Sequence, residues 1–161
     1  FSESYATGIQ VIIVKDGSEI KSLDDLFVFN DDGDPTALKN TDIKVGVQEN
    51  TTGDIYSTDE FGDEFIERYP KGSDAVLALT QGKIDAVIID NEPAKSFVAA
   101  NEGLKILDAE WAVEDYAIAI AKENKALLDA VNNALAELTA DGTIAAIIAK
   151  YIPTAAEDVT A

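Results

Sequence analysis

The sequence predicts an α/β fold, in which helices cover both faces of a sheet. Short runs rich in Ile and Val alternate with helical patterns along most of the chain. Several of these runs are continuously apolar, which is typical of strands that are covered on both faces. The end of the chain differs, because its apolar residues follow a helical period without a further strand. Alternating strands and helices favour a sheet whose strands are joined by helical crossovers.

The first part of the chain predicts two strands with a connection between them. The apolar run "IQVIIV" predicts a strand over Ile9–Val14, and "IKVGVQ" predicts a second strand over Ile43–Gln48. Between them, "SLDDL" predicts a short capped helical turn at Ser22–Leu26. The polar stretch Asn30–Asp42 contains turn-forming residues and predicts a surface loop.

The second strand is followed by two predicted helices. Apolar residues at helical spacing predict a helix over Thr52–Tyr69, although Gly62 lies within it and Pro70 follows it. A shorter helix is predicted over Ser73–Gln81. Gly82 follows that helix and is expected to end it in the left-handed conformation.

The next part of the chain returns to alternating elements. The run "IDAVIID" predicts a strand that ends at Asp90, and Pro93–Ala100 predicts a helix. Two further strands are predicted, at Leu104–Asp108 and, from the alternating pattern "YAIAIA", at Tyr116–Ala121.

Two consecutive helices are predicted at the end of the chain, separated by Gly142. The second carries apolar residues over Ile144–Tyr151. The apolar stripe of the first helix comprises Leu127, Leu128, Val131, Leu135 and Leu138. These faces need something to cover them.

Composition excludes several function classes. The chain has 161 residues, 47% of them hydrophobic, which is enough to bury a core. Its formal charge of −19 repels nucleic acid and anionic membrane surfaces. It contains no Cys and no His, so disulfides, zinc–thiolate sites and a Ser-His-Asp triad are excluded. No apolar run approaches the roughly 20 residues of a membrane span.

The acidic stretch Asn30–Pro35 lacks the pattern of an EF-hand and predicts a solvated loop, so we expect neither metal nor cofactor.

The stretch "KVGVQENTTGDIY" places small polar residues where a strand gives way to a helix. The first N–H groups of a helix lack intrahelical partners and attract anions, so Thr51, Thr52 and Gly53 could hold an anion. Asn50 tolerates the left-handed conformation that such a turn needs. The residues alone leave another interpretation open, in which a threonine caps this helix and Asp90 caps the next one without any ligand.

The order of motifs resembles the bacterial solute-binding proteins that deliver polar amino acids to ABC transporters. The matching segments are "FSESY", "GIQVIIVK", "SLDDL", "KVGVQENTTGDIY", "DAVLALTQGKIDAVIIDNEPAKSFVA", "GLKIL", "EDYAIAIAKEN" and "LLDAVNNALAELTADGTIAAIIAKYI". The resemblance implies the two-lobed type II periplasmic-binding-protein fold and a binding protein rather than an enzyme. It also implies a free amino acid as ligand, an ABC transporter permease as partner, and a location outside the cytoplasm, in the periplasm or as a surface lipoprotein.

The resemblance also assigns residues to a ligand site. Thr52 and Gly53, with Thr51 beside them, match the turn that receives the α-carboxylate of the amino acid. Asp90 matches the carboxylate that binds the α-ammonium group. Gln48 matches a position that commonly faces the ligand side chain.

The resemblance divides the chain into three parts. Residues 1–15 would be the end of the first lobe with a first crossing strand, 16–115 the second lobe, and 116–161 a second crossing strand with C-terminal helices of the first lobe. We therefore expect a fragment with half of the site, and a homodimer that covers the terminal helices. Two alternatives remain open: an enzyme of the same fold, such as a cyclohexadienyl-type dehydratase, and the ligand-binding ectodomain of a sensor.

Overall fold

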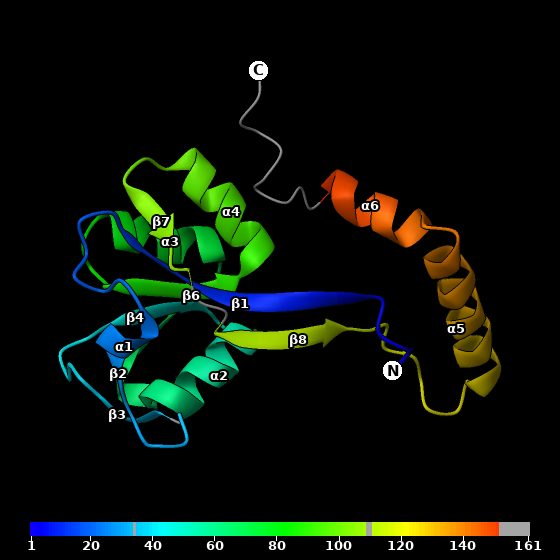
Figure 1. Cartoon of the computed structure of the whole chain (residues 1–161), viewed down its shortest axis with the longest axis horizontal. Helices are drawn as coiled ribbons and strands as arrows, with labels where there is room; N and C mark the ends of the chain where they lie inside the picture. Colours follow the sequence, from blue (N-terminus) through cyan, green and yellow to red (C-terminus); the bar gives the residue numbers. More distant parts are fainter. Residues whose placement is uncertain (34, 109–110, 152–161) are drawn as a thin grey trace. The chain divides into compact units, whose positions relative to one another are not determined.

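The computed structural model describes residues 1–33, 35–108 and 111–151 (Figure 1). Contacts divide the chain into two units. The first, which we call the α/β unit, is Ile9–Val113. The second, the terminal unit, combines Phe1–Gly8 with Glu114–Ala161. The predicted site residues all belong to the α/β unit.

The main sheet is mixed, with the strand order β5-β4-β6-β1-β7, and β8 also pairs with β1. β4 runs parallel to β5 and β6, whereas β1 runs antiparallel to β6 and β7. The strands are β1 (Ala6–Lys15), β4 (Val45–Gln48), β5 (Ile66–Tyr69), β6 (Ala86–Asp90), β7 (Leu104–Ile106) and β8 (Ala112–Tyr116). The predicted first strand and the strand ending at Asp90 are thereby confirmed.

Helices lie on both faces of this sheet. α2 (Thr52–Phe61) lies on one face, and α3 (Gly72–Thr80) and α4 (Asn91–Ala100) lie on the other (Figure 1). Successive side chains of a strand point to opposite faces of its sheet. The side chains of β1 therefore contribute to the hydrophobic cores on both faces. Ile12 and Val14 belong to the core that includes Phe61 of α2, whereas Val11 and Ile13 belong to the core that includes Val76 of α3.

The helix predicted over Thr52–Tyr69 is wrong in its second half. α2 ends at Phe61, because Gly62 takes a φ of 95°, which is incompatible with a helix. A 3₁₀ turn over Asp63–Phe65 follows, and Ile66–Tyr69 forms β5. Parallel pairing of β5 with β4 stabilises this extended segment. The spacing of apolar residues within Thr52–Tyr69 does not reveal this pairing with a separate strand.

The loop predicted over Asn30–Asp42 is also corrected in part. The short helix α1 (Leu23–Leu26) begins as expected after Ser22, but it leads into a small antiparallel sheet. Its strands are β2 (Phe27–Phe29) and β3 (Pro35–Leu38). Buried Phe27 packs in the core with Phe61, and this packing fixes the hairpin to the α/β unit.

The strand predicted over Tyr116–Ala121 is wrong, because β8 ends at Tyr116. The residues beyond it contact the start of the chain in an irregular way. Ser2 donates its N–H to the Ile118 carbonyl at 2.9 Å, and the Ser2 hydroxyl accepts the Ile118 N–H at 2.9 Å. Since a side chain replaces one backbone partner, no regular ladder forms.

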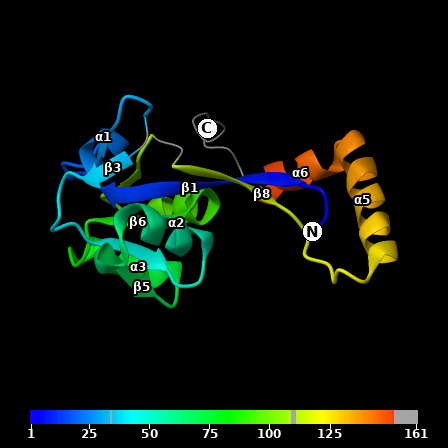
Figure 2. The same ribbon diagram turned by 90° about the horizontal axis from the view of Figure 1, so that it is seen from below.

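The terminal unit ends in two helices that follow one another across a tight turn (Figure 2). α5 (Lys125–Ala140) starts at its cap, Asn124, and α6 (Thr143–Tyr151) follows Gly142, whose φ is 81°. No residue of α5 is buried. Within the described ranges, every helix falls short of the length and apolar character that a membrane span requires.

Candidate functional site

The turn between β4 and α2 is built around Asn50 and Thr51. Asn50 has a φ of 60°, so the left-handed turn expected from the sequence is present. The Thr51 hydroxyl donates to the Gln48 carbonyl at 2.8 Å and accepts the Asp54 N–H at 3.4 Å. Thr51 is therefore the helix cap, and its hydroxyl is already engaged in the turn.

Asp54 fixes this turn, and it is not among the residues predicted for the site. Its buried carboxylate accepts the Asn50 N–H at 3.0 Å and the Arg68 Nε–H at 2.9 Å. Arg68 also pairs with Asp63 at 2.8 Å. Hydrogen bonding to Asp63, and then the charge of Asp54, raises the pKa of the Arg68 guanidinium above its ordinary value. The Thr51-x-x-Asp54 spacing, which is typical of a capped helix start, was the available signal.

Thr52 and Gly53 occupy the first helical positions of α2. Backbone N–H groups at these positions have no intrahelical acceptor, and the helix dipole favours negative charge there. The half-buried Thr52 side chain makes no hydrogen bond to any other residue that the structure describes. The hydroxyl of Thr52 and the N–H groups of Thr52 and Gly53 can therefore receive a carboxylate together.

Gly53 packs closely against the sheet. A Cβ atom at this position would lie 2.9 Å from Gln10 Oε1 and 3.3 Å from the carbonyl oxygen of Ile88. A glycine therefore allows the start of α2 to approach β1 and β6. This approach brings the helix start to the part of β6 that leads into Asp90.

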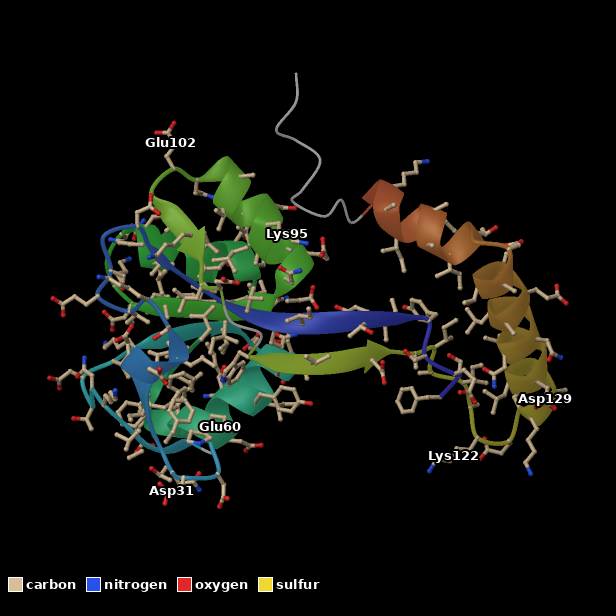
Figure 3. The ribbon with its side chains drawn as sticks, viewed as in Figure 1. Asp31, Glu60, Lys95, Glu102, Lys122 and Asp129 are labelled. Atoms are coloured by element: carbon tan, nitrogen blue, oxygen red, sulfur yellow. The ribbon has the colours of Figure 1, made fainter. Side chains whose placement is uncertain are left out.

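Asp90 ends β6 and caps α4. Its Oδ1 accepts the Glu92 N–H at 3.1 Å, so Asp90 is the cap of this helix. Glu92 pairs with Lys95 at 2.9 Å, and Figure 3 labels Lys95 on α4. Glu92 is thus engaged both through its N–H, by Asp90, and through its carboxylate, by Lys95.

Gln10 lies directly opposite Asp90 in the antiparallel β1–β6 ladder. Paired residues of such a ladder have side chains on the same face of the sheet. Gln10 is 4% exposed, and its Oε1 lies against Gly53. Gln10 therefore links the start of α2 to Asp90. It is not among the residues predicted for the site, because it lies within an apolar run.

Gln48 lies elsewhere. Its Oε1 is 3.6 Å from the position that a Cβ atom on Gly72 would occupy, at the start of α3. Thr52 and Gly53 thus belong to α2, and Asp90 lies on the face of the sheet that α2 covers. The Gln48 side chain lies beside α3 instead. The assignment of Gln48 to a ligand side chain stays a prediction.

A surface recess lies at the other end of the strands, with Lys15, Glu19 and Asp85 among its lining residues. Asp85 accepts the Lys44 N–H at 2.8 Å there, so its carboxylate has a structural partner. The recess is remote from Asp90, at the opposite end of β6. In the part of the chain that the structure describes, no group of three or more His, Cys, Asp or Glu residues is placed to hold a metal ion.

Acidic side chains are spread over the surface of both units. Figure 3 labels Asp31 near β2 and β3, Glu60 on α2, Glu102 after α4 and Asp129 on α5. Their distribution fits the formal charge of −19. A net charge this far from zero favours solubility and does not by itself select a ligand.

Sequence comparison relates residues 1–154 to the bacterial extracellular solute-binding proteins, family 3. The chain is 31% identical over 155 residues to the L-cystine-binding protein TcyJ of Escherichia coli, covering 94% of the chain and 53% of that protein. It is 30% identical over 115 residues to the E. coli ABC transporter arginine-binding protein 1, covering 68% of the chain and 47% of that protein. The chain thus spans about half the length of these relatives.

Solved structures agree with this relationship. An ancestral arginine-binding protein bound to glutamine matches with a TM-score of 0.76 and 33% identity, over 96% of this chain and 64% of that one. The ArtJ protein of Geobacillus stearothermophilus, which binds arginine, lysine and histidine, matches with a TM-score of 0.74 and 29% identity, over 96% and 62%. These matches confirm the α/β, type II periplasmic-binding-protein fold.

Proposed function

Because the chain belongs to the bacterial extracellular solute-binding proteins of family 3, we propose that it forms one side of a site for a free amino acid. In the whole protein, this site would serve an ABC uptake transporter. The reported relatives are binding proteins for amino acids, and none of them is described as an enzyme. Their names therefore favour the binding protein over the dehydratase.

One observation carries the proposal: a helix start suited to an anion and a carboxylate suited to a cation belong to the same packed region. Gly53 contacts Gln10, and Gln10 pairs with Asp90. An α-amino acid carries a carboxylate and an ammonium group on one carbon atom, so its ligand site must offer both kinds of partner at short range. Thr52 and Gly53 would bind the carboxylate, and Asp90 would bind the ammonium group.

Binding in the whole protein would proceed by closure of two lobes on the amino acid. β1 and β8 each run across the boundary between the two units, so they are candidates for hinge strands. A ligand that contacts both lobes stabilises the closed form by its differential affinity for that form. The closed form would then be recognised by the permease of the transporter, outside the cytoplasm, with the protein either free in the periplasm or attached as a lipoprotein.

For the isolated 161-residue chain, we also propose a homodimer. Large apolar side chains of the terminal helices are exposed: Leu127 by 47%, Leu138 by 38% and Ile147 by 50%. Contiguous exposed apolar surface favours association. A second copy of the chain offers the same faces and can cover them by a two-fold symmetric contact.

Calorimetric titration of the whole protein tests the binding proposal. The probes are L-arginine, L-histidine, L-glutamine and L-cystine, which represent the relatives' ligands. Binding of at least one probe at micromolar concentration, with one site per protein, is the expected result. Absence of heat and of thermal stabilisation for all four probes at millimolar concentration would count against the proposal.

A further inference from the structure

Gln10 is a buried polar residue inside an apolar strand. It is 4% exposed, and the following residues Val11, Ile12 and Ile13 are 5%, 0% and 0% exposed. Buried side-chain amides are normally hydrogen-bonded. Among the described residues, however, none forms a hydrogen bond with the Gln10 side chain. Within the described ranges, the Gln10 side chain therefore has no hydrogen-bond partner.

The position of Gln10 indicates which partner could satisfy it. Its Oε1 lies 2.9 Å from the point where a Cβ atom on Gly53 would sit, and the residue pairs with Asp90 across the ladder. The amide thus contacts the expected carboxylate site, and its residue is the ladder partner of Asp90, the expected ammonium site. It is on the face of the sheet that α2 covers.

We propose that Gln10 is a further ligand-binding residue, which contacts the α-ammonium group of the amino acid together with Asp90. The inference rests on the proposed function of this site. An ammonium group presents three N–H donors, and a buried one needs more than one acceptor. Asp90 already uses Oδ1 to accept the Glu92 N–H. The neutral amide oxygen of Gln10 supplies a further acceptor without placing a second negative charge beside Asp90.

A purely structural role for Gln10 makes a different prediction. If the side chain only fills space beneath Gly53, its replacement lowers stability and weakens every ligand to the same extent. If it contacts the ammonium group, its replacement weakens only those ligands that carry this group. A pair of ligands that differ in the ammonium group alone therefore separates the two roles.

The experiment uses the whole protein and the best-binding of L-arginine, L-histidine, L-glutamine and L-cystine. The matched ligand is its deamino acid, with the same side chain and carboxylate. Gln10→Met keeps a similar shape without the amide, Gln10→Glu keeps an acceptor oxygen, and Ile12→Val is a control from the same strand and face. Calorimetry gives each affinity, and the thermal midpoint without ligand gives stability.

We expect Gln10→Met to weaken the amino acid by about 10- to 100-fold and the deamino acid by less than about threefold, as for loss of a hydrogen bond to a charged group. Gln10→Glu keeps an acceptor oxygen and should keep the wild-type preference for the amino acid over the deamino acid, a comparison that does not need Gln10→Met to fold. Ile12→Val should change neither affinity by more than about threefold.

Equal weakening of both ligands by Gln10→Met, or an unchanged affinity for the amino acid, would overturn the role of Gln10 while leaving the site intact. If the wild-type protein binds none of the four amino acids, the proposed function itself fails, and the inference with it. If Asp90→Asn loses binding while Gln10→Met binds with full affinity, the ligand site lies at Asp90 and Gln10 is not part of it.

Discussion

Asp54 and Arg68 join the start of α2 to β5, with 2.9 Å between Oδ1 and Nε. The Asp54 side chain is 11% exposed, and its other oxygen holds the N–H of Asn50. We expect Asp54→Ala to lower the free energy of unfolding by about 1 to 3 kcal/mol, because a largely buried, charged hydrogen bond is lost and Asn50 loses its acceptor.

Asp63→Ala is the matched control for Asp54→Ala, since Asp63 pairs with the same arginine at 2.8 Å but is 75% exposed. Exposed pairs contribute little, so the expected loss is below about 1 kcal/mol. Urea unfolding followed by circular dichroism measures both variants. If both variants lose the same free energy of unfolding, the burial of Asp54 does not strengthen its pair with Arg68.

The adjacent threonines Thr51 and Thr52 should have separable roles. Thr51→Ala removes the cap and should cost about 1 kcal/mol of stability without ligand. Thr52→Ala should leave stability within about 0.5 kcal/mol and weaken amino-acid binding, because its hydroxyl is not used in the fold. Urea unfolding and calorimetry of both variants provide the comparison. A stability loss in Thr52→Ala as large as that in Thr51→Ala would contradict this division.

Gly53→Ala should destabilise the protein although alanine favours helices. Its Cβ atom would lie 3.3 Å from the backbone oxygen of Ile88, which cannot move independently of β6. Overpacking costs about 1 to 3 kcal/mol, which exceeds the helix-propensity gain of up to about 1 kcal/mol. Gly17→Ala is the control, since nothing lies within 4 Å of that Cβ position. A thermal midpoint of Gly53→Ala at or above that of Gly17→Ala would refute the close packing.

Asp90→Asn tests the charge of Asp90 apart from its capping role, because asparagine caps helices about as well as aspartate. Affinity of the whole protein for its amino acid should fall by about 3 kcal/mol, since the ammonium group loses its charged partner. Stability without ligand should change by less than about 0.5 kcal/mol. Asp74→Asn makes the same change at the exposed start of α3 and should not affect binding.

Light scattering of the isolated chain at micromolar concentration tests the homodimer. We expect the wild-type chain to have the mass of a dimer and the double variant Leu127→Glu with Leu138→Glu to have that of a monomer. Leu77→Glu is the control, because Leu77 is a 56% exposed helical leucine in the α/β unit and should leave the dimer intact. A monomeric wild-type chain would reject the proposal.

Local patterns predicted much of the fold. The largely apolar run at Ile9–Val14 indicated a strand covered on both faces, and Gly82 and Gly142 were correctly expected to end helices. The helix over Thr52–Tyr69 was overextended because a helical spacing of apolar residues does not reveal a partner strand. β5 exists because β4 offers it a parallel edge.

The sequence by itself determined the α/β class, the capped helix start at Thr51–Gly53 and the position of Asp90 at a strand end, because each depends on neighbouring residues. Only the tertiary structure decided that Asp54 is held by Arg68 and that Gln48 lies beside α3. It also placed Gln10 opposite Asp90. These two residues are 80 positions apart in the chain, and their pairing depends on the antiparallel register of β1 and β6, which is fixed by packing on both faces of the sheet.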